Sequence, residues 1–264
     1  MLLATSQDRP TEPVDRQQIF TPPFRERTAD ALLHHFQTRT TVHYFPVPDL
    51  IETARPKIDD ILRHQFEFNG ERHQVPTSIQ WLVNPSRDQE WLILLHKFYY
   101  AVGLGMAYYE TTRPEYAEKW VALTSSWIQS VPLDFLPSDV AGRRIQNWIF
   151  AHYYFVSAIQ LSCITPDFYL SFLQSLHHQV SYLRDHVTPA RNHRTLELCA
   201  IFLAAVVFPE FSESREWLTW SRDELMKNIQ CDLQPDGVHC EQSTDYHHLV
   251  LKNYLWVKKL ARLN

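Results

Sequence analysis

Residues 235–248, PDGVHCEQSTDYHH, combine a turn signal with many ionisable side chains directly before an apolar helical segment. Eight of these fourteen positions carry a titratable group: Asp236, His239, Cys240, Glu241, Asp245, Tyr246, His247 and His248. Enzymes use such groups to take up and release protons. A solvated loop would have a similar composition, so the segment is a candidate for proton-transfer chemistry and needs a second feature to support it.

The Pro-Asp-Gly of this segment predicts a chain reversal, because Pro fixes φ and Gly tolerates a positive φ. Ser243 is a good N-cap for the helix that follows. Tyr246 then lies in the first turn, on the same face as Val250 and Asn253, and we expect it to point towards the core side. Backbone amides and the helix dipole would favour a phenolate there. A lone Tyr at such a position is more often an interior aromatic residue, and only the surrounding cluster favours chemistry.

A second candidate is the start of the segment at residues 188–211, where Asn192 and His193 precede an almost wholly apolar helix. An Asn at this place is most often an N-cap. The pair also places an amide donor and an imidazole at the edge of any cleft that this helix borders.

The elements that must position these residues are predicted to be helices. The chain has 264 residues, 45% of them hydrophobic, and its 5 Gly against 16 Pro favour helices punctuated by prolines. From residue 87 onward, amphipathic segments of about fifteen to twenty residues each end at a proline or polar turn. We therefore predict an all-α fold of helical hairpins over residues 28–264, after a loosely ordered leader at residues 1–27. Periodicity does not choose between a toroid, a solenoid and a bundle.

Composition excludes several classes of function. The net charge is −5 and the basic residues form no stripe, so we expect no nucleic-acid partner. No apolar run is long enough to span a membrane, and the N-terminus lacks the features of a signal peptide. The His residues show no metal-binding spacing, and we expect neither a metal nor a cofactor. Free thiols are expected for the four cysteines, with Cys231 and Cys240 as the only pair that could form a bridge.

Taken together, the blocks GRRIQNW, RNH and DGVHCEQSTDYHH, with the helical region from IQWLVNPSRDQEW onward, resemble the heparinase II/III-like polysaccharide lyases. That family includes heparin, heparan sulfate and alginate lyases. The resemblance covers roughly residues 65–262. It implies an α/α toroid of helical hairpins followed by a β-sandwich domain, and cleavage of uronic-acid-containing polysaccharides by β-elimination.

The resemblance also implies roles for the two candidate sites. β-Elimination removes the proton α to the uronate carboxylate and expels the 4-linked sugar oxygen, so a donor must stabilise charge on the carboxylate and another group must move the proton. The family's roles fall on Asn192 as the carboxylate neutraliser and on Tyr246 as the general acid, and as the base in a syn elimination. His193 is the adjacent candidate.

Further residues are candidates for binding the acidic polysaccharide. A guanidinium suits planar anions, and an indole can stack on a sugar ring, although burial in the core is the commoner use of Trp. The loop residues would orient the loop or contact sugar hydroxyls. These candidates are Arg143, Arg144, Trp81, Trp148, Glu241, Gln242 and His247.

The chain departs from the family pattern at its C-terminal side. It stops at residue 264, so the family's remaining toroid helices, its β-sandwich and a downstream His are not in it. The resemblance thus implies an incomplete toroid, either a fragment of a longer product or a short and inactive protein. An exposed apolar face would be covered by self-association or by a β-sandwich partner domain. The family often works in the periplasm.

Two other functions stay open. A glycoside hydrolase on an α/α toroid would use Asp236 and Glu241 as its carboxylate pair, and would leave no unsaturated sugar. A non-catalytic carbohydrate-binding or assembly module would bind the chain without cutting it.

Overall fold

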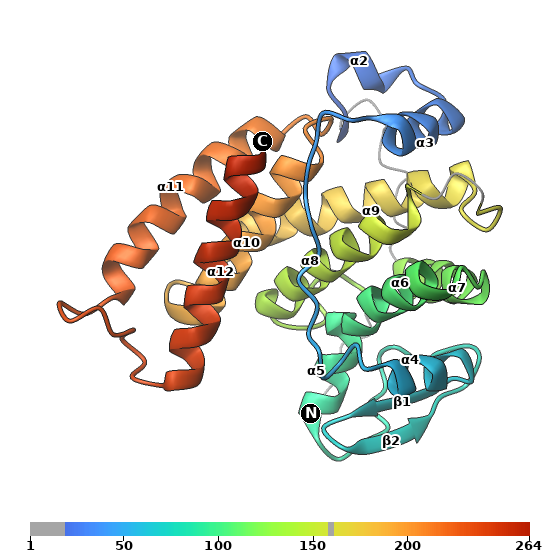
Figure 1. Cartoon of the computed structure of the whole chain (residues 1–264), viewed down its shortest axis with the longest axis horizontal. Coiled ribbons are helices and arrows are strands. Elements are labelled where there is room, and N and C mark those ends of the chain that lie inside the picture. The colour runs from blue at the N-terminus through green and yellow to red at the C-terminus, as the bar shows by residue number, and fades with distance from the viewer. Residues whose placement is uncertain (1–18, 158–160) are drawn as a thin grey trace, which may run out of the picture.

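The computed structural model describes residues 19–157 and 161–264, and these form a succession of helices with one small β-hairpin (Figure 1). The helices are α2 (Pro22–Arg25), α3 (Ala29–Thr38), α4 (Arg55–Leu62), α5 (Gln89–Lys97), α6 (Tyr99–Thr111), α7 (Glu115–Ser130), α8 (Ser138–Phe155), α9 (Pro166–Asp185), α10 (Arg191–Val207), α11 (Ser214–Asp232) and α12 (Thr244–Leu263). The strands are β1 (Gln65–Phe68) and β2 (Glu71–Gln74).

The helices from α6 onward form an arc with two layers. In the inner layer α6 packs against α8, α8 against α10, and α10 against α12. In the outer layer α7 packs against α6, α9 against α8 and α10, and α11 against α10. The expected all-α fold of helical hairpins is confirmed. The central position of α10 follows from its sequence, since residues 198–205 are apolar around the whole helix and all are buried.

The described N-terminal residues are folded onto the arc. Residues 1–18 of the expected leader lie outside the described residues, whereas Ile19 and Phe20 are buried and Phe20 forms a β-bridge with Phe211. Arg39, after α3, forms an ion pair with Glu210 at 2.9 Å. The folded part therefore begins earlier than the boundary expected at residue 27.

Residues 39–49, here called the crossing segment, run in an extended path from α3 towards α4 across the face of α8 (Figure 1). The Tyr44 hydroxyl lies 2.7 Å from Nδ1 of the buried His152 in α8. The backbone of His43 exchanges hydrogen bonds of 2.9 and 2.6 Å with the side chain of Asn264. The segment therefore connects α8 with the C-terminal end of α12.

The β-hairpin formed by β1 and β2 lies between α4 and α5 along the chain. The strands pair antiparallel, and Asn69 and Gly70 between them have φ values of 53° and 77°. Asn-Gly is a typical hairpin turn, because both residues tolerate a positive φ. Phe66 and Phe68 are buried against Tyr100, so alternating aromatic residues hold the hairpin to the helices.

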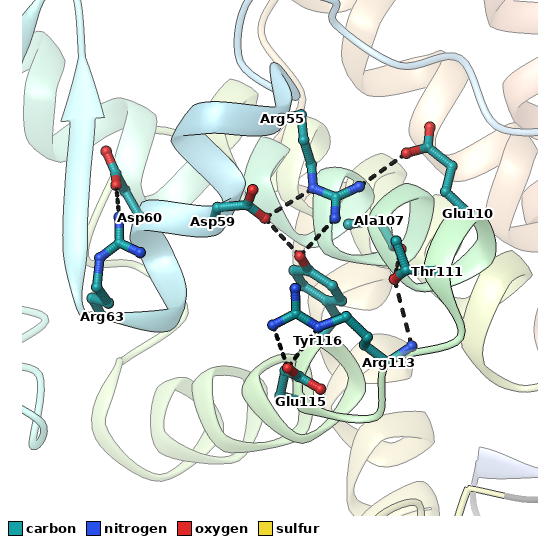
Figure 2. A network of polar contacts seen from close by, with 10 residues as sticks. All are labelled: Arg55, Asp59, Asp60, Arg63, Ala107, Glu110, Thr111, Arg113, Glu115 and Tyr116. Atoms are coloured by element: carbon teal, nitrogen blue, oxygen red, sulfur yellow. Dashed lines mark hydrogen bonds and ion pairs between the residues drawn. The ribbon is translucent and has the colours of Figure 1, made fainter.

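A polar network attaches α4 to the α6–α7 hairpin (Figure 2). The guanidinium of Arg55 donates to Asp59 at 2.8 Å, to the Tyr116 hydroxyl at 2.8 Å and to Glu110 at 3.0 Å. The same Tyr116 hydroxyl donates to Asp59 at 2.6 Å, while its ring is buried. Because the carboxylates and the guanidinium satisfy one another, the network can hold three helices together at a partly exposed position.

Within the described residues, no helix is both long enough and apolar enough to cross a membrane.

The contact between α4 and α6 gives a test of this packing. Gly103 faces Ile58, and a Cβ at residue 103 would overlap the Ile58 side chain. Gly103→Ala should lower the free energy of unfolding by about 1–3 kcal/mol, because overpacking exceeds the gain in helix propensity. Urea unfolding measures this. Ile58→Ala should lower the free energy of unfolding by less when it is added to Gly103→Ala than when it is made in the wild type. A Gly103→Ala protein as stable as the wild type would contradict the close packing.

Candidate active site

The first turn of α10 is completed by a residue far away in the sequence. The backbone N–H of Asn192 donates to Glu241 Oε1 at 3.0 Å, and its side-chain Nδ2 lies 2.8 Å from each carboxylate oxygen. The commonest expectation, that Asn192 is the N-cap, is wrong, because Ala190 holds that position and Asn192 lies inside the helix. Glu241 supplies the acceptor that a capping side chain would have supplied, and its charge suits a helix N-terminus.

The environment of Glu241 keeps it ionised. Burial by itself raises the pKa of its carboxyl, whereas the hydrogen bonds from the backbone and side chain of Asn192 lower it. The charges of His239 and Arg191 act in the same direction, so the pKa lies below its ordinary value. Asn192 therefore faces a carboxylate near neutral pH.

The loop before α12 is held by its own backbone. The predicted reversal at Pro-Asp-Gly is confirmed, with Gly237 at φ 84° and a β-bridge between Leu233 and His239. The Cys240 N–H donates to the Asp232 carbonyl at 2.7 Å, and the His239 side chain is fully buried. These contacts fix Glu241 relative to the end of α11.

Tyr246 lies in the first turn of α12. The predicted N-cap is confirmed, since Ser243 Oγ accepts from the Tyr246 N–H at 3.4 Å. The expectation that Tyr246 points towards the core is wrong, because its side chain is 45% exposed. Tyr246 does share a helical face with Val250 and Asn253, but burial of this face begins only at Val250, one turn later. The phenol is therefore accessible to a ligand.

His193 joins the first turns of α8 and α10. Its Nδ1 lies 3.3 Å from Asp139 Oδ2, and the imidazole is largely exposed. Next to it, Ser138 donates to Glu197 at 2.7 Å. Asp139 was not a candidate from the sequence, because nothing in the local pattern indicates that these two helices begin side by side. The contacts of Asn192 and His193 bring together the N-terminal ends of α8, α10 and α12.

Of the loop candidates, His247 contacts the loop and Gln242 faces solvent. His247 Nδ1 accepts from the backbone N–H of His239 at 3.4 Å. Gln242 is exposed with φ 52°, and its N–H donates to the His239 carbonyl at 2.9 Å. Both residues thus adjoin Glu241.

Arg143 lies on the face of α8 that also carries Asp139. Its Nη1 donates to Gln146 at 2.9 Å, and its guanidinium lies 5.7 Å from the centre of the Tyr99 ring. The side chain is half-buried and lines a cavity shared with α12. Its role in binding an anion stays a prediction.

Arg144 is not placed to bind substrate. It is buried, donates to Gln179 at 2.6 Å and lies 4.1 Å from the centre of the Trp127 ring. Burial lowers its pKa to about 9. Neighbouring residues on a helix point about 100° apart, so Arg143 and Arg144 cannot both face the site.

Trp81 and Trp148 are also in the core, so neither can stack on a sugar in this structure. The indole N–H of Trp81 donates to Ser126 at 2.9 Å, and Trp148 packs against Trp127 and Phe172. The commoner use of Trp as core explains both residues.

The carboxylates proposed for a hydrolase have other partners. Asp236 Oδ1 accepts from the Val238 N–H at 3.0 Å in an exposed turn, and Glu241 binds Asn192. The two groups thus stabilise a turn and a helix end, which disfavours the hydrolase.

The contact of Glu241 gives a prediction with a defined pH dependence. Glu241→Gln should lower the free energy of unfolding at neutral pH by about 1–2 kcal/mol, because α10 loses a charged acceptor. Since the folded pKa of Glu241 lies below its ordinary 4.5, its contribution is complete above that value and is lost as pH falls through the folded pKa. The difference between variant and wild type should therefore shrink in acid.

Urea unfolding at neutral and acidic pH measures this difference. Asp236→Asn is the matched control, as it removes a carboxylate from the same loop that contacts only its own turn. Equal effects of the two substitutions at every pH would show that Glu241 has no special role.

The chain is similar to known proteins over most of its length. Residues 20–264 match the family described as Heparinase II/III N-terminus. A heparin-sulfate lyase of Pedobacter heparinus is 29% identical over 215 residues, covering 77% of this chain and 32% of that protein. A heparin-sulfate lyase of Bacteroides thetaiotaomicron is 23% identical over 261 residues, covering 89% and 37%. The chain thus spans about a third of the length of these relatives.

Solved structures agree with the sequence matches. A crystal structure of heparinase III has a TM-score of 0.78 at 23% identity, covering 89% of this chain and 39% of the other. The heparan sulfate lyase HepC from Pedobacter heparinus has a TM-score of 0.72 at 27% identity, covering 88% and 40%. The two-layered arc is therefore an α/α toroid of helical hairpins, as expected.

Proposed function

Because the chain belongs to the heparinase II/III family, we propose that it supplies the helical catalytic part of a polysaccharide lyase that cleaves uronic-acid-containing polysaccharides by β-elimination. The relatives that carry the name heparin-sulfate lyase support this substrate class. The observation that carries the proposal is the contact of Asn192 with the carboxylate of Glu241. Glu241 lies in the loop that leads into α12, whose first turn carries the exposed Tyr246.

Asn192 is suited to neutralise a uronate carboxylate. Its Nδ2 already lies 2.8 Å from both oxygens of Glu241, so the local geometry accepts a planar anion. A substrate carboxylate would replace Glu241 at one of the two amide N–H groups. The backbone N–H groups at the start of α10 add favourable charge at the same place.

Tyr246 is suited to move the proton. As phenolate it would take the proton α to the carboxylate while the bond to the 4-linked sugar oxygen breaks and the ring double bond forms. The resulting phenol would then give this proton to the leaving oxygen, so no proton is gained or lost overall. The exposure of Tyr246 in the first turn of α12 supports access to a polymer. His193, paired with Asp139, is the second candidate for proton transfer.

We also propose that α12 packs against further structure in the active assembly. Leu251 and Leu255, one turn apart on its outer face, are 45% and 56% exposed. The curated relatives extend well beyond the matched region. Additional toroid helices and a β-sandwich domain with a further His, as the resemblance implies, would cover this face, and a second copy of the chain is the other occupant to test.

The reaction is tested with Tyr246→Phe and Asn192→Ala in the full-length natural protein, with this chain in parallel. Each should lower kcat/KM on a uronate polysaccharide at least ~100-fold, because each removes a proton-transfer group or an electrostatic donor. The ultraviolet absorbance of unsaturated uronate measures turnover. Tyr246→Phe should leave stability within about 0.5 kcal/mol, since the side chain is exposed.

Tyr109→Phe is the matched control, because Tyr109 is another exposed Tyr, on α6, and should keep full activity. Unchanged turnover in Tyr246→Phe would remove Tyr246 from the mechanism. Sugar binding by the wild type without any unsaturated product would favour the non-catalytic binding module.

A further inference from the structure

A small cavity lies between α8, α12 and the crossing segment, close to the candidate active site. Its volume is about 90 Å³, which gives room for a few atoms such as a carboxylate or sulfate group, but not for a sugar ring. Its lining includes Asp49, Tyr99, Arg143, Lys252, Asn253 and Trp256. Most of this polar lining comes from α8 and α12, the helices that also carry Asp139 and Tyr246.

Two buried donors on the α12 side of this cavity have no partner among the described residues. Asn253 and Trp256 are each 7% exposed, and neither Asn253 Nδ2 nor Trp256 Nε1 makes a hydrogen bond. They are three residues apart and therefore share a helical face. A buried N–H without an acceptor is costly, so an acceptor that enters the cavity and draws either N–H towards it by a small side-chain rotation would stabilise the bound state. Trp120 and Trp148 also have unpaired indole N–H groups, but they line none of the described cavities.

The charges around the cavity favour an anion. Arg143 uses Nη1 for Gln146 and, like Lys252, forms no ion pair within the described part of the chain. Asp49 is the one acidic residue in the described lining, and its Oδ1 already accepts the N–H groups of Ile51 and Glu52 at 3.0 and 3.1 Å. Two cations against one carboxylate suit a ligand group with a single negative charge.

The cavity also has a fixed relation to the candidate active site. Asn253 follows Tyr246 by seven residues on the same face of α12, which is about 10 Å along the helix axis. On α8, Arg143 follows Asp139 by one turn. A polysaccharide with one uronate bound at Tyr246 would therefore bring a substituent of another sugar along the same chain to the cavity.

We propose that this cavity is a subsite for an acidic substituent, a carboxylate or a sulfate ester, carried by the same polysaccharide beyond the sugar at Tyr246. The inference rests on the proposed function for its choice of ligand. Asn253 and Trp256 donate to the anion, and Arg143 and Lys252 supply the compensating charge.

The test uses Asn253→Leu and Trp256→Phe, which keep the volume and remove the donors, with Trp120→Phe as the matched control. Binding is measured by calorimetry with three probes: an unsulfated uronate octasaccharide, its carboxyl-reduced form and its sulfated form. Each subsite variant should weaken binding of an acidic probe about five- to tenfold, whereas the control should not. The carboxyl-reduced probe should bind all variants and the wild type alike.

The probes separate the two acidic groups. A loss seen equally with the unsulfated and sulfated probes assigns a carboxylate to the cavity, and a loss confined to the sulfated probe assigns a sulfate. Arg143→Gln is a third variant, for use if either α12 variant folds poorly, because it leaves the buried face of α12 intact. It should weaken binding of the same acidic probe. Unchanged binding of both acidic probes by all three variants would overturn the subsite.

Turnover by the full-length protein, measured in parallel, distinguishes this inference from the proposed function. If the wild type turns over its substrate and every subsite variant binds the acidic probes as the wild type does, the lyase function is supported and the subsite is contradicted. Weakened binding in the variants, with no unsaturated product from the wild type, would leave the subsite and remove the lyase. A wild type that binds no acidic probe would overturn both.

Discussion

The contact between Asn192 and Glu241 is the interaction on which the candidate site depends. It satisfies donors at the first turn of α10, fixes the loop before α12, and holds an amide against a carboxylate. The two residues come from different hairpins, so the contact also sets how α12 begins relative to α10. One charged hydrogen-bonded pair thereby connects the fold of the inner layer with the chemistry proposed for it.

Features governed by neighbouring residues could be predicted from the sequence. The helical hairpins, the reversal at Pro-Asp-Gly and the Ser243 cap all depend on local propensity, and all are present. The family and its toroid followed from the blocks around Asn192 and Tyr246, and the comparisons agree. The Asn69–Gly70 turn between β1 and β2 is another local feature of this kind, because both residues tolerate a positive φ.

Features governed by distant residues could not be predicted. The acceptor for Asn192 lies 49 residues away, and the partner of His193 is on another helix. Helical periodicity could not tell which of Arg143 and Arg144 faces the cavity between α8 and α12, or that Trp148 belongs to the core. Tyr246 was assigned to the correct face, yet its exposure depends on where burial against the arc begins along α12. These properties belong to the packed arrangement and not to any segment.

The crossing segment has a consequence for the order of folding. Its backbone at His43 pairs with Asn264, 221 residues later, while the hairpins of the arc close over much shorter separations. Contacts with a large sequence separation form late, because the entropy of closing the loop must be overcome before they stabilise anything. During synthesis, α12 must leave the ribosome before the crossing segment can pair with its C-terminal end. The cavity and the arrangement around Tyr246 are therefore assembled last, on an arc that has already formed.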